Sequence, residues 1–213
     1  MPRRHARADS PKNSSRGNRL RLEIAAEAAR IMSTEGQRSY LLAKQKAAAR
    51  LGASSRNGLP SNSEIEQALR QWQQLYGGEE HEHTLNELRR SATAAMRFLA
   101  PFRPRLVGPV LEGTADQFSR VCLHLYADDP DAMVRFLMEK GVPFEQERRR
   151  IRWHDGDYRD IDVLVVEAGG QTVEMALMIG RDALQPPPSP IDGRPLARAS
   201  LEEVEALITP DLD

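Results

Sequence analysis

The stretch that is most informative about the fold reads Gly108-Pro-Val-Leu-Glu-Gly-Thr-Ala-Asp-Gln-Phe-Ser-Arg-Val-Cys-Leu-His-Leu125. It opens and closes on apolar runs, and two glycines and the small pair Thr114-Ala115 lie between them. Small residues let one backbone segment approach another closely, so the pattern predicts a tight turn between two strands. We expect these strands at residues 106–111 and 121–126.

The second of these strands begins with an unusual pair of side chains. Successive side chains of a strand point to opposite faces, so Arg120 and Cys122 share one face and Val121 takes the other. Two carboxylates at that spacing would hold Mg²⁺, which prefers oxygen ligands. A fixed cation about 4 Å from Mg²⁺ would instead oppose its binding by about 8 kcal/mol at an effective dielectric of about 20. The strand therefore has the spacing of a metal site without its ligands.

The same stretch resembles the signature of the nucleotidyltransferase fold, the DNA polymerase β-like superfamily. That signature reads Gly-Ser, then a short loop of the form Gly-x-Ala-x-x-x-Ser, then Asp-hydrophobic-Asp on the next strand. In this chain Gly108, Gly113, Ala115 and Ser119 match it. The resemblance implies that residues 84–182 form a mixed α+β sheet domain.

Several positions depart from the family pattern. Pro109 stands where the family has serine, and Arg120 and Cys122 stand where it has its two metal-binding aspartates. The third carboxylate of the family matches Glu174, with Asp162 as a competitor; a lone Glu on a strand is also typical of a solvent-exposed face. The resemblance thus implies a degenerate site with no intact catalytic residue, no metal and no cofactor, Mg²⁺ being expected only if the protein is active.

Composition limits the remaining possibilities. Charged residues make up 29% of the 213 residues and aromatic residues 5%, which is typical of a soluble protein with a modest core. The single cysteine excludes an internal disulfide framework. The chain has no apolar run long enough to span a bilayer and no signal-peptide pattern, so we expect a cytoplasmic protein with no membrane partner.

The order of patterns predicts an α+β protein in four parts. Residues 1–18 are read as a disordered basic tail, which either contacts nucleic acid or keeps the chain soluble. Residues 19–78 are predicted to be helical, residues 79–183 to form the nucleotidyltransferase-like domain, and residues 184–213 to be a stiff proline-rich linker followed by an acidic helix.

The helical part admits two interpretations. Apolar residues at helical spacing predict helices over residues 20–36, 39–51 and 61–76, and a fourth over 84–100. The first two resemble the helix-turn-helix arm of TetR-type repressors, which would turn Lys44, Lys46 and Arg50 towards DNA phosphates. A plain helical hairpin with solvated lysines fits the same pattern.

The second half changes to the period of strands. A helix is expected over residues 131–140, and strands over 144–153, 161–166 and 172–179, the last two joined at Gly169-Gly170. Arg148, Arg149 and Arg150 stand out as a basic run. They indicate either a phosphate-binding edge or an edge strand that charge protects from aggregation.

Three functions follow from these patterns. The first is a catalytically degenerate nucleotidyltransferase-fold protein that binds a nucleotide, RNA or a protein partner without transfer. Its phosphate contacts would come from Gly108, Gly113, Thr114, Arg148, Arg149 and Arg150. The second is an active nucleotidyltransferase with displaced carboxylates at Asp116, Asp162 and Glu174, and the third is a DNA-binding regulator that uses the N-terminal helices. The pair Arg120/Cys122 favours the first over the second.

Overall fold

The computed structural model describes residues 11–53, 58–129 and 131–209, and the chain divides into two compact units between Tyr76 and Gly77. The first unit contains helices α1 (Pro11–Glu35), α2 (Tyr40–Arg50) and α3 (Asn62–Tyr76). Its core gathers alanines and isoleucines at helical spacing, among them Ile24, Ala28, Ala43 and Ile65. Ser39 caps α2, and Ser61 and Glu64 form a capping box before α3.

Helix α1 corrects the prediction for the N-terminal tail. It begins at Pro11, so residues 11–18, which we expected to be disordered, are helical, whereas residues 1–10 lie outside the described part. Once its packed half around Ile24 has formed a nucleus, each further residue adds one backbone hydrogen bond. Arg19 and Glu23 support this extension with an ion pair one turn apart.

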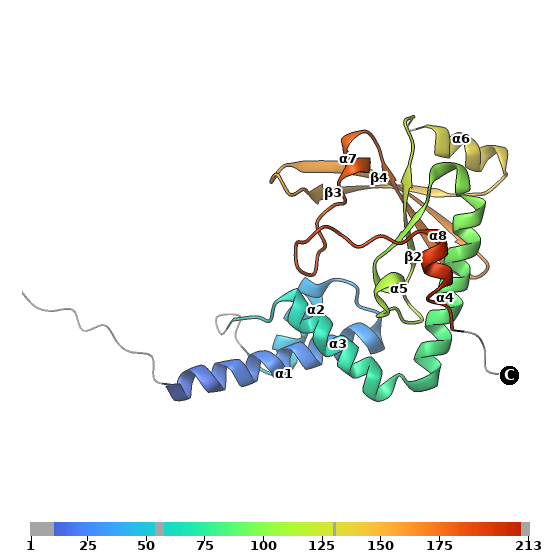
Figure 1. The fold of residues 1–213 in the computed structure, drawn as a ribbon. Coiled ribbons are helices and arrows are strands. Elements are labelled where there is room, and N and C mark those ends of the chain that lie inside the picture. Colours follow the sequence, from blue (N-terminus) through green and yellow to red (C-terminus); the bar gives the residue numbers. More distant parts are fainter. Residues whose placement is uncertain (1–10, 54–57, 130, 210–213) are drawn as a thin grey trace, which may run out of the picture. The chain divides into compact units, whose positions relative to one another are not determined.

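The second unit is a mixed sheet with helices, which confirms the α+β class (Figure 1). In chain order its elements are α4 (Gly78–Phe98), the 3₁₀ turn η2 (Ala100–Phe102), β1 (Arg105–Val107), α5 (Pro109–Glu112), β2 (Val121–Tyr126), α6 (Ala132–Glu139), β3 (Glu145–Arg152), β4 (Tyr158–Ala168), β5 (Gln171–Met178), α7 (Arg181–Leu184) and α8 (Leu201–Glu205). The fourth predicted helix thus begins earlier than expected. None of the described helices is both long and apolar enough to cross a membrane.

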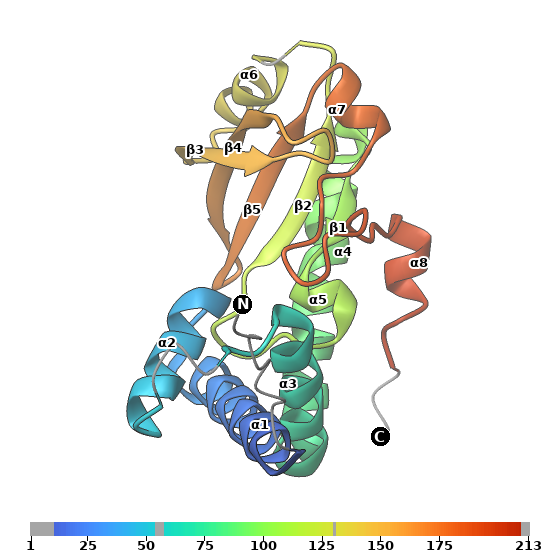
Figure 2. The same ribbon diagram turned by 90° about the vertical axis from the view of Figure 1, so that its left-hand side faces the viewer.

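The strands lie in the order β1-β2-β5-β4-β3 (Figure 2). Only the β2–β5 pair is parallel; the other neighbouring pairs are antiparallel. One face of the sheet packs its apolar side chains against α4 and α6, through residues such as Leu123, Met175, Leu88 and Leu137. On the opposite face a smaller cluster brings Ala183 of α7 against Met178 and its neighbours. Cys122, His124 and Glu174 of β2 and β5 lie on this second face.

The C-terminal segment belongs to the second unit. The predicted proline-rich linker is a turn, because Leu196 N–H donates to the Pro187 carbonyl at 2.9 Å and Ser189 N–H donates to the Arg194 carbonyl at 2.7 Å. Ala199 then pairs with Leu106 of β1. Helix α8 begins with a Ser200–Glu203 capping box and lies against α4, burying Val204 completely.

The turn around Gly108 differs from the prediction in two ways. The first strand ends at Val107, and the short helix α5 starts at Pro109, whose fixed φ suits a first helical position. A Cβ added at Gly108 would have no neighbour closer than Cys122 Cβ at 4.0 Å, so no backbone approaches closely there. Glycine is required instead by the backbone itself, which has φ +72° and ψ −155°.

We therefore expect Gly108→Ala and Gly108→Val to destabilise the second unit to a similar degree, by about 1–3 kcal/mol each. Both variants meet the same backbone strain, and neither meets a steric clash. Urea unfolding of the two variants and the wild type measures this. If only the valine variant lost stability, steric crowding rather than the positive φ would be the reason that residue 108 is glycine.

Candidate functional site

The candidate site lies on the sheet face opposite α4 and α6, where β2 and β5 run side by side. The register of the parallel pair sets Cys122 opposite Glu174 and His124 opposite Ala176. Arg120 directly precedes β2 and reaches the same face. The sequence resemblance assigned Arg120, Cys122 and Glu174 to one site, and the structure brings these three residues together.

Glu174 is held by two arginines. Its Oε1 lies 2.5 Å from Nη1 of Arg120, and its Oε2 lies 2.7 Å from Nη1 of Arg149 on β3. The Glu174 side chain is only 10% exposed, whereas those of Arg120 and Arg149 are 34% and 41% exposed. Arg149 also binds Oε2 of Glu147 at 2.9 Å through Nη2. The buried carboxylate therefore has charge-assisted hydrogen bonds on both oxygens.

These contacts decide the ionisation of Glu174. Burial alone would raise its pKa, because a carboxylate loses solvation in the interior. The hydrogen bonds from Arg149 and Arg120 outweigh that effect and hold the pKa below its ordinary value of 4.5. The same bond to Glu174 raises the pKa of Arg149. Near neutral pH the site therefore consists of an ionised carboxylate between two charged guanidinium groups.

Cys122 completes the group without adding a strong ligand. Its half-buried Sγ lies 3.7 Å from the Arg120 carbonyl oxygen and 3.8 Å from Oε2 of Glu174. A thiol is a weak donor at such distances. Within the described ranges, no three His, Cys, Asp or Glu side chains form a group suited to a metal ion. A divalent cation at Glu174 would have to displace both guanidinium groups.

His124 is a member of this face that the sequence analysis missed. It is 6% exposed, and among the described residues its Nδ1 has no hydrogen-bond partner. Burial, with help from the charge of Arg198, lowers the pKa of His124 to about 4. The side chain is therefore neutral near pH 7. Because side chains of a strand alternate between faces, His124, two residues after Cys122, could have been assigned to this face from the sequence.

In the turn at residues 108–114, which contains Gly108 and Gly113, backbone groups form hydrogen bonds with one another. Glu112 N–H donates to the Gly108 carbonyl at 2.9 Å, and Thr114 N–H donates to the Pro109 carbonyl at 3.0 Å. Thr114 is buried, and Gly113 ends α5 in the left-handed conformation. The amides of Glu112 and Thr114 thus bind carbonyl groups of the same turn rather than being presented to a ligand.

The basic run on β3 is divided between the two faces of the sheet. Arg149 points to the Glu174 side, so Arg148 and Arg150 point to the other. Arg148 Nε lies 3.2 Å from Oδ1 of Asp162, and the Arg150 guanidinium lies 4.7 Å above the ring of Tyr158. The run therefore does not form one continuous patch.

The displaced carboxylates also lie apart. Asp162 pairs with Arg148 on the face opposite Glu174, because Val165, three residues later, is the residue in register with Glu174. Asp116 accepts hydrogen bonds from Phe118 N–H and from the Ser119 hydroxyl, which closes a local turn. Asp162 therefore cannot share a metal ion with Glu174.

In the first unit, the three cations of the repressor-like hairpin are engaged internally. Lys44 Nζ donates to the Pro60 carbonyl and to Asn62, each at 2.8 Å. Lys46 pairs with Glu35, and Arg50 Nη1 lies 2.8 Å from Glu35 and 3.0 Å from Glu27. These contacts fit the plain helical hairpin better than a surface that presents three charges to DNA phosphates.

Comparison with protein-family models, with curated proteins and with solved structures finds no match for the chain. The comparisons therefore identify no family, and the resemblance to the nucleotidyltransferase signature stays a prediction that rests on residues 108–125 and Glu174.

We expect Glu174→Gln to lower the free energy of unfolding at pH 7 by about 1–3 kcal/mol, because two partly buried guanidinium groups lose their counter-charge. Glu145→Gln, an exposed change on β3, serves as the control and should have an effect within about 0.5 kcal/mol.

The same pair of proteins tests the pH dependence. The folded pKa of Glu174 is lowered, so its contribution is complete above the unfolded value near 4.5 and is lost as pH falls through the folded pKa. In urea titrations, the stability gap between wild type and Glu174→Gln should therefore close in acid. A gap that is constant from pH 7 to strong acid would contradict this assignment.

Proposed function

We propose that the second unit contains the nucleotidyltransferase-like domain expected over residues 79–183, and that this domain binds its ligand without catalysing transfer. The support comes from Arg120, Cys122 and Glu174, which the resemblance assigns to the three metal-ligand positions and which meet on one face of β2 and β5. In this proposal the strands keep the arrangement of a nucleotidyltransferase active site. An arginine in a metal-ligand position removes the ability to bind Mg²⁺.

The observation that carries the proposal is the double ion pair on Glu174. Metal-dependent transfer needs carboxylate oxygens that are open to Mg²⁺. Here both oxygens of Glu174 bind guanidinium groups at 2.5 and 2.7 Å. The cationic charge that a metal would supply next to this carboxylate is supplied by the protein instead.

The ligand that this face suits best is the phosphate group of a nucleotide. Arg120 and Arg149 are partly exposed, and a guanidinium group has five donors, more than the contacts with Glu174 and Glu147 use. Phosphate oxygens are good acceptors for such donors. RNA offers the same chemistry, and a protein partner with an acidic side chain is the remaining alternative.

Two other functions have weaker support. An active nucleotidyltransferase with displaced carboxylates requires Asp162 near Glu174, and these residues lie on opposite faces of the sheet. A DNA-binding regulator requires exposed cations on α2, and Lys44, Lys46 and Arg50 bind groups of their own unit.

Calorimetric titration with ATP, with and without Mg²⁺, tests the proposal. We expect ATP to bind equally well in both conditions and no transfer to an added acceptor to occur. Arg120→Ala should weaken binding about tenfold or more, because a charge-assisted hydrogen bond is lost. Arg148→Ala, which removes an arginine from the opposite face, is the matched control and should bind ATP normally. Transfer that depends on Mg²⁺ would refute the proposal, and the absence of ATP binding would reject the nucleotide as ligand.

Restoring carboxylates tests the alignment itself. In the double variant Arg120→Asp with Cys122→Asp, two new carboxylates lie on the face of Glu174, so Mn²⁺ affinity should rise at least about tenfold over the wild type. Adding Arg149→Gln should raise it further, because the last guanidinium group beside Glu174 is then removed. A double variant that is folded by circular dichroism and gains no Mn²⁺ affinity would show that Arg120 and Cys122 do not occupy ligand positions.

A further inference from the structure

The opposite face of the sheet holds a pocket that the proposed nucleotide site does not use. It has a volume of about 370 Å³, which falls within the range of small-molecule sites, roughly 300–1,000 Å³. It opens between α4, α6 and the hairpin of β4 and β5. Its lining consists of Ser91, Ala94, Ala95, Phe98, Leu99, Leu137, Val142, Val166, Ala168, Gly169, Val173 and Met175.

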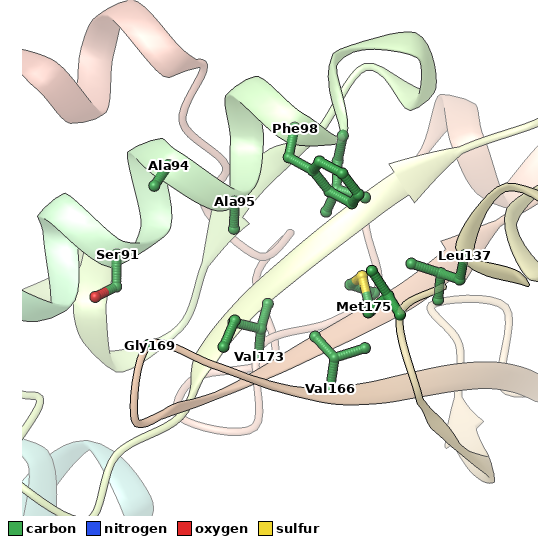
Figure 3. A pocket seen from close by; sticks show the side chains of 12 residues that line it. Ser91, Ala94, Ala95, Phe98, Leu137, Val166, Gly169, Val173 and Met175 are labelled. Atoms are coloured by element: carbon green, nitrogen blue, oxygen red, sulfur yellow. The ribbon is translucent and has the colours of Figure 1, made fainter. Parts of the chain in front are cut away.

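Small side chains on α4 create this space. Ser91, Ala95 and Phe98 are spaced four and three residues apart, so they form one stripe of the helix. In Figure 3 this stripe faces Val173 and Val166 of the sheet across the pocket. Alanine has no side-chain atom beyond Cβ, so the helix does not fill the gap above these valines.

The pocket extends along α4. Ser91 and Gly169 lie at one end, where β4 turns into β5, and Phe98, Leu137 and Met175 lie at the other (Figure 3). The seven residue-to-residue steps from Ser91 to Phe98 correspond to about 10 Å along the helix axis. An extended chain fits such a space better than a compact ring system does.

We propose that this pocket binds a free, unbranched aliphatic molecule with an uncharged polar end. The chain lies along α4 over Val166, Val173 and Met175, where its burial removes apolar surface of both partners from water. The polar end lies at Ser91, whose hydroxyl can donate or accept a hydrogen bond. Among the described residues that line the pocket, Ser91 alone has a polar side chain.

The chemistry of the lining decides against a charged end group. A carboxylate or ammonium group that is drawn from water needs an opposite charge or several hydrogen bonds. The described residues that line the pocket offer a single hydroxyl and no charged group. On α4 next to them, Arg90 pairs with Glu87. Arg97 of α4 pairs with Glu205, and Arg148 of β3, on the same face of the sheet, pairs with Asp162. Arginines that are already paired offer less charge to anionic headgroups than a free basic rim does, which favours a free molecule over a bilayer lipid.

Calorimetric titration of the full chain with n-decanol tests this proposal. We expect saturable binding by the wild type. Ala95→Met adds a flexible apolar side chain inside the pocket and should weaken binding at least about tenfold. His83→Met places the same side chain at an exposed position of α4 outside the lining and should leave binding unchanged. Ser91→Met, at the Gly169 end of the pocket, provides a second variant with a filled pocket. It tests whether n-decanol binds there if Ala95→Met does not fold.

Several outcomes would overturn the proposal. One is a wild-type protein that does not bind n-decanol. Another is a folded Ala95→Met or Ser91→Met variant that binds n-decanol as tightly as the wild type does. Binding of n-decanoate as tight as that of n-decanol would overturn the uncharged end group. Cosedimentation with phosphatidylcholine vesicles, abolished by Ala95→Met, would assign the pocket to a membrane lipid. Self-association that Ala95→Met abolishes, without binding of n-decanol, would make this face a protein interface.

Discussion

The parallel pairing of β2 with β5 is the constraint on which the second unit depends. Its register sends Leu123 and Met175 under α4 and α6, and it sends Cys122 and Glu174 to the other face. A shift of one strand by one residue would exchange its faces and expose the core. Burial of the core fixes the register of the two strands, and the register fixes which polar residues meet. The Glu174 site on one face and the apolar pocket on the other both depend on this pairing.

Glu174 shows how burial and charge are reconciled in this sheet. A carboxylate that is 10% exposed needs a positive charge beside it. In a metal-dependent enzyme that charge would come from divalent ions shared with further carboxylates. Here Arg120 and Arg149 provide the positive charge, so the buried carboxylate is neutralised without a metal. The pocket above Val166 and Val173 lies on the other face, where apolar contacts dominate.

Alternation and helical spacing predicted most elements of this fold, because these signals are local. They failed where backbone geometry or distant contacts decide. The first strand stops at Val107 because Gly108 has a positive φ and Pro109 starts a helix. The segment at 186–190 forms a turn that hydrogen bonds to residues 194–196 close, and Ala199 beyond it pairs with Leu106, which is far away in the sequence. The meeting of Arg120 with Glu174 was predictable from the resemblance, but the contribution of Arg149 depends on strand order, which no single stretch encodes.

The central claim is that Glu174 remains ionised because two guanidinium groups bind it. Carbon-13 NMR titration of the Glu174 side-chain carboxyl in the folded protein tests this claim most directly, with Glu174→Gln to assign the signal. The account predicts a pKa below the ordinary 4.5 in the wild type and a rise in the Arg120→Ala variant. A wild-type pKa above 4.5, unchanged by Arg120→Ala, would mean that burial dominates and that the ion pairs do not hold the site together.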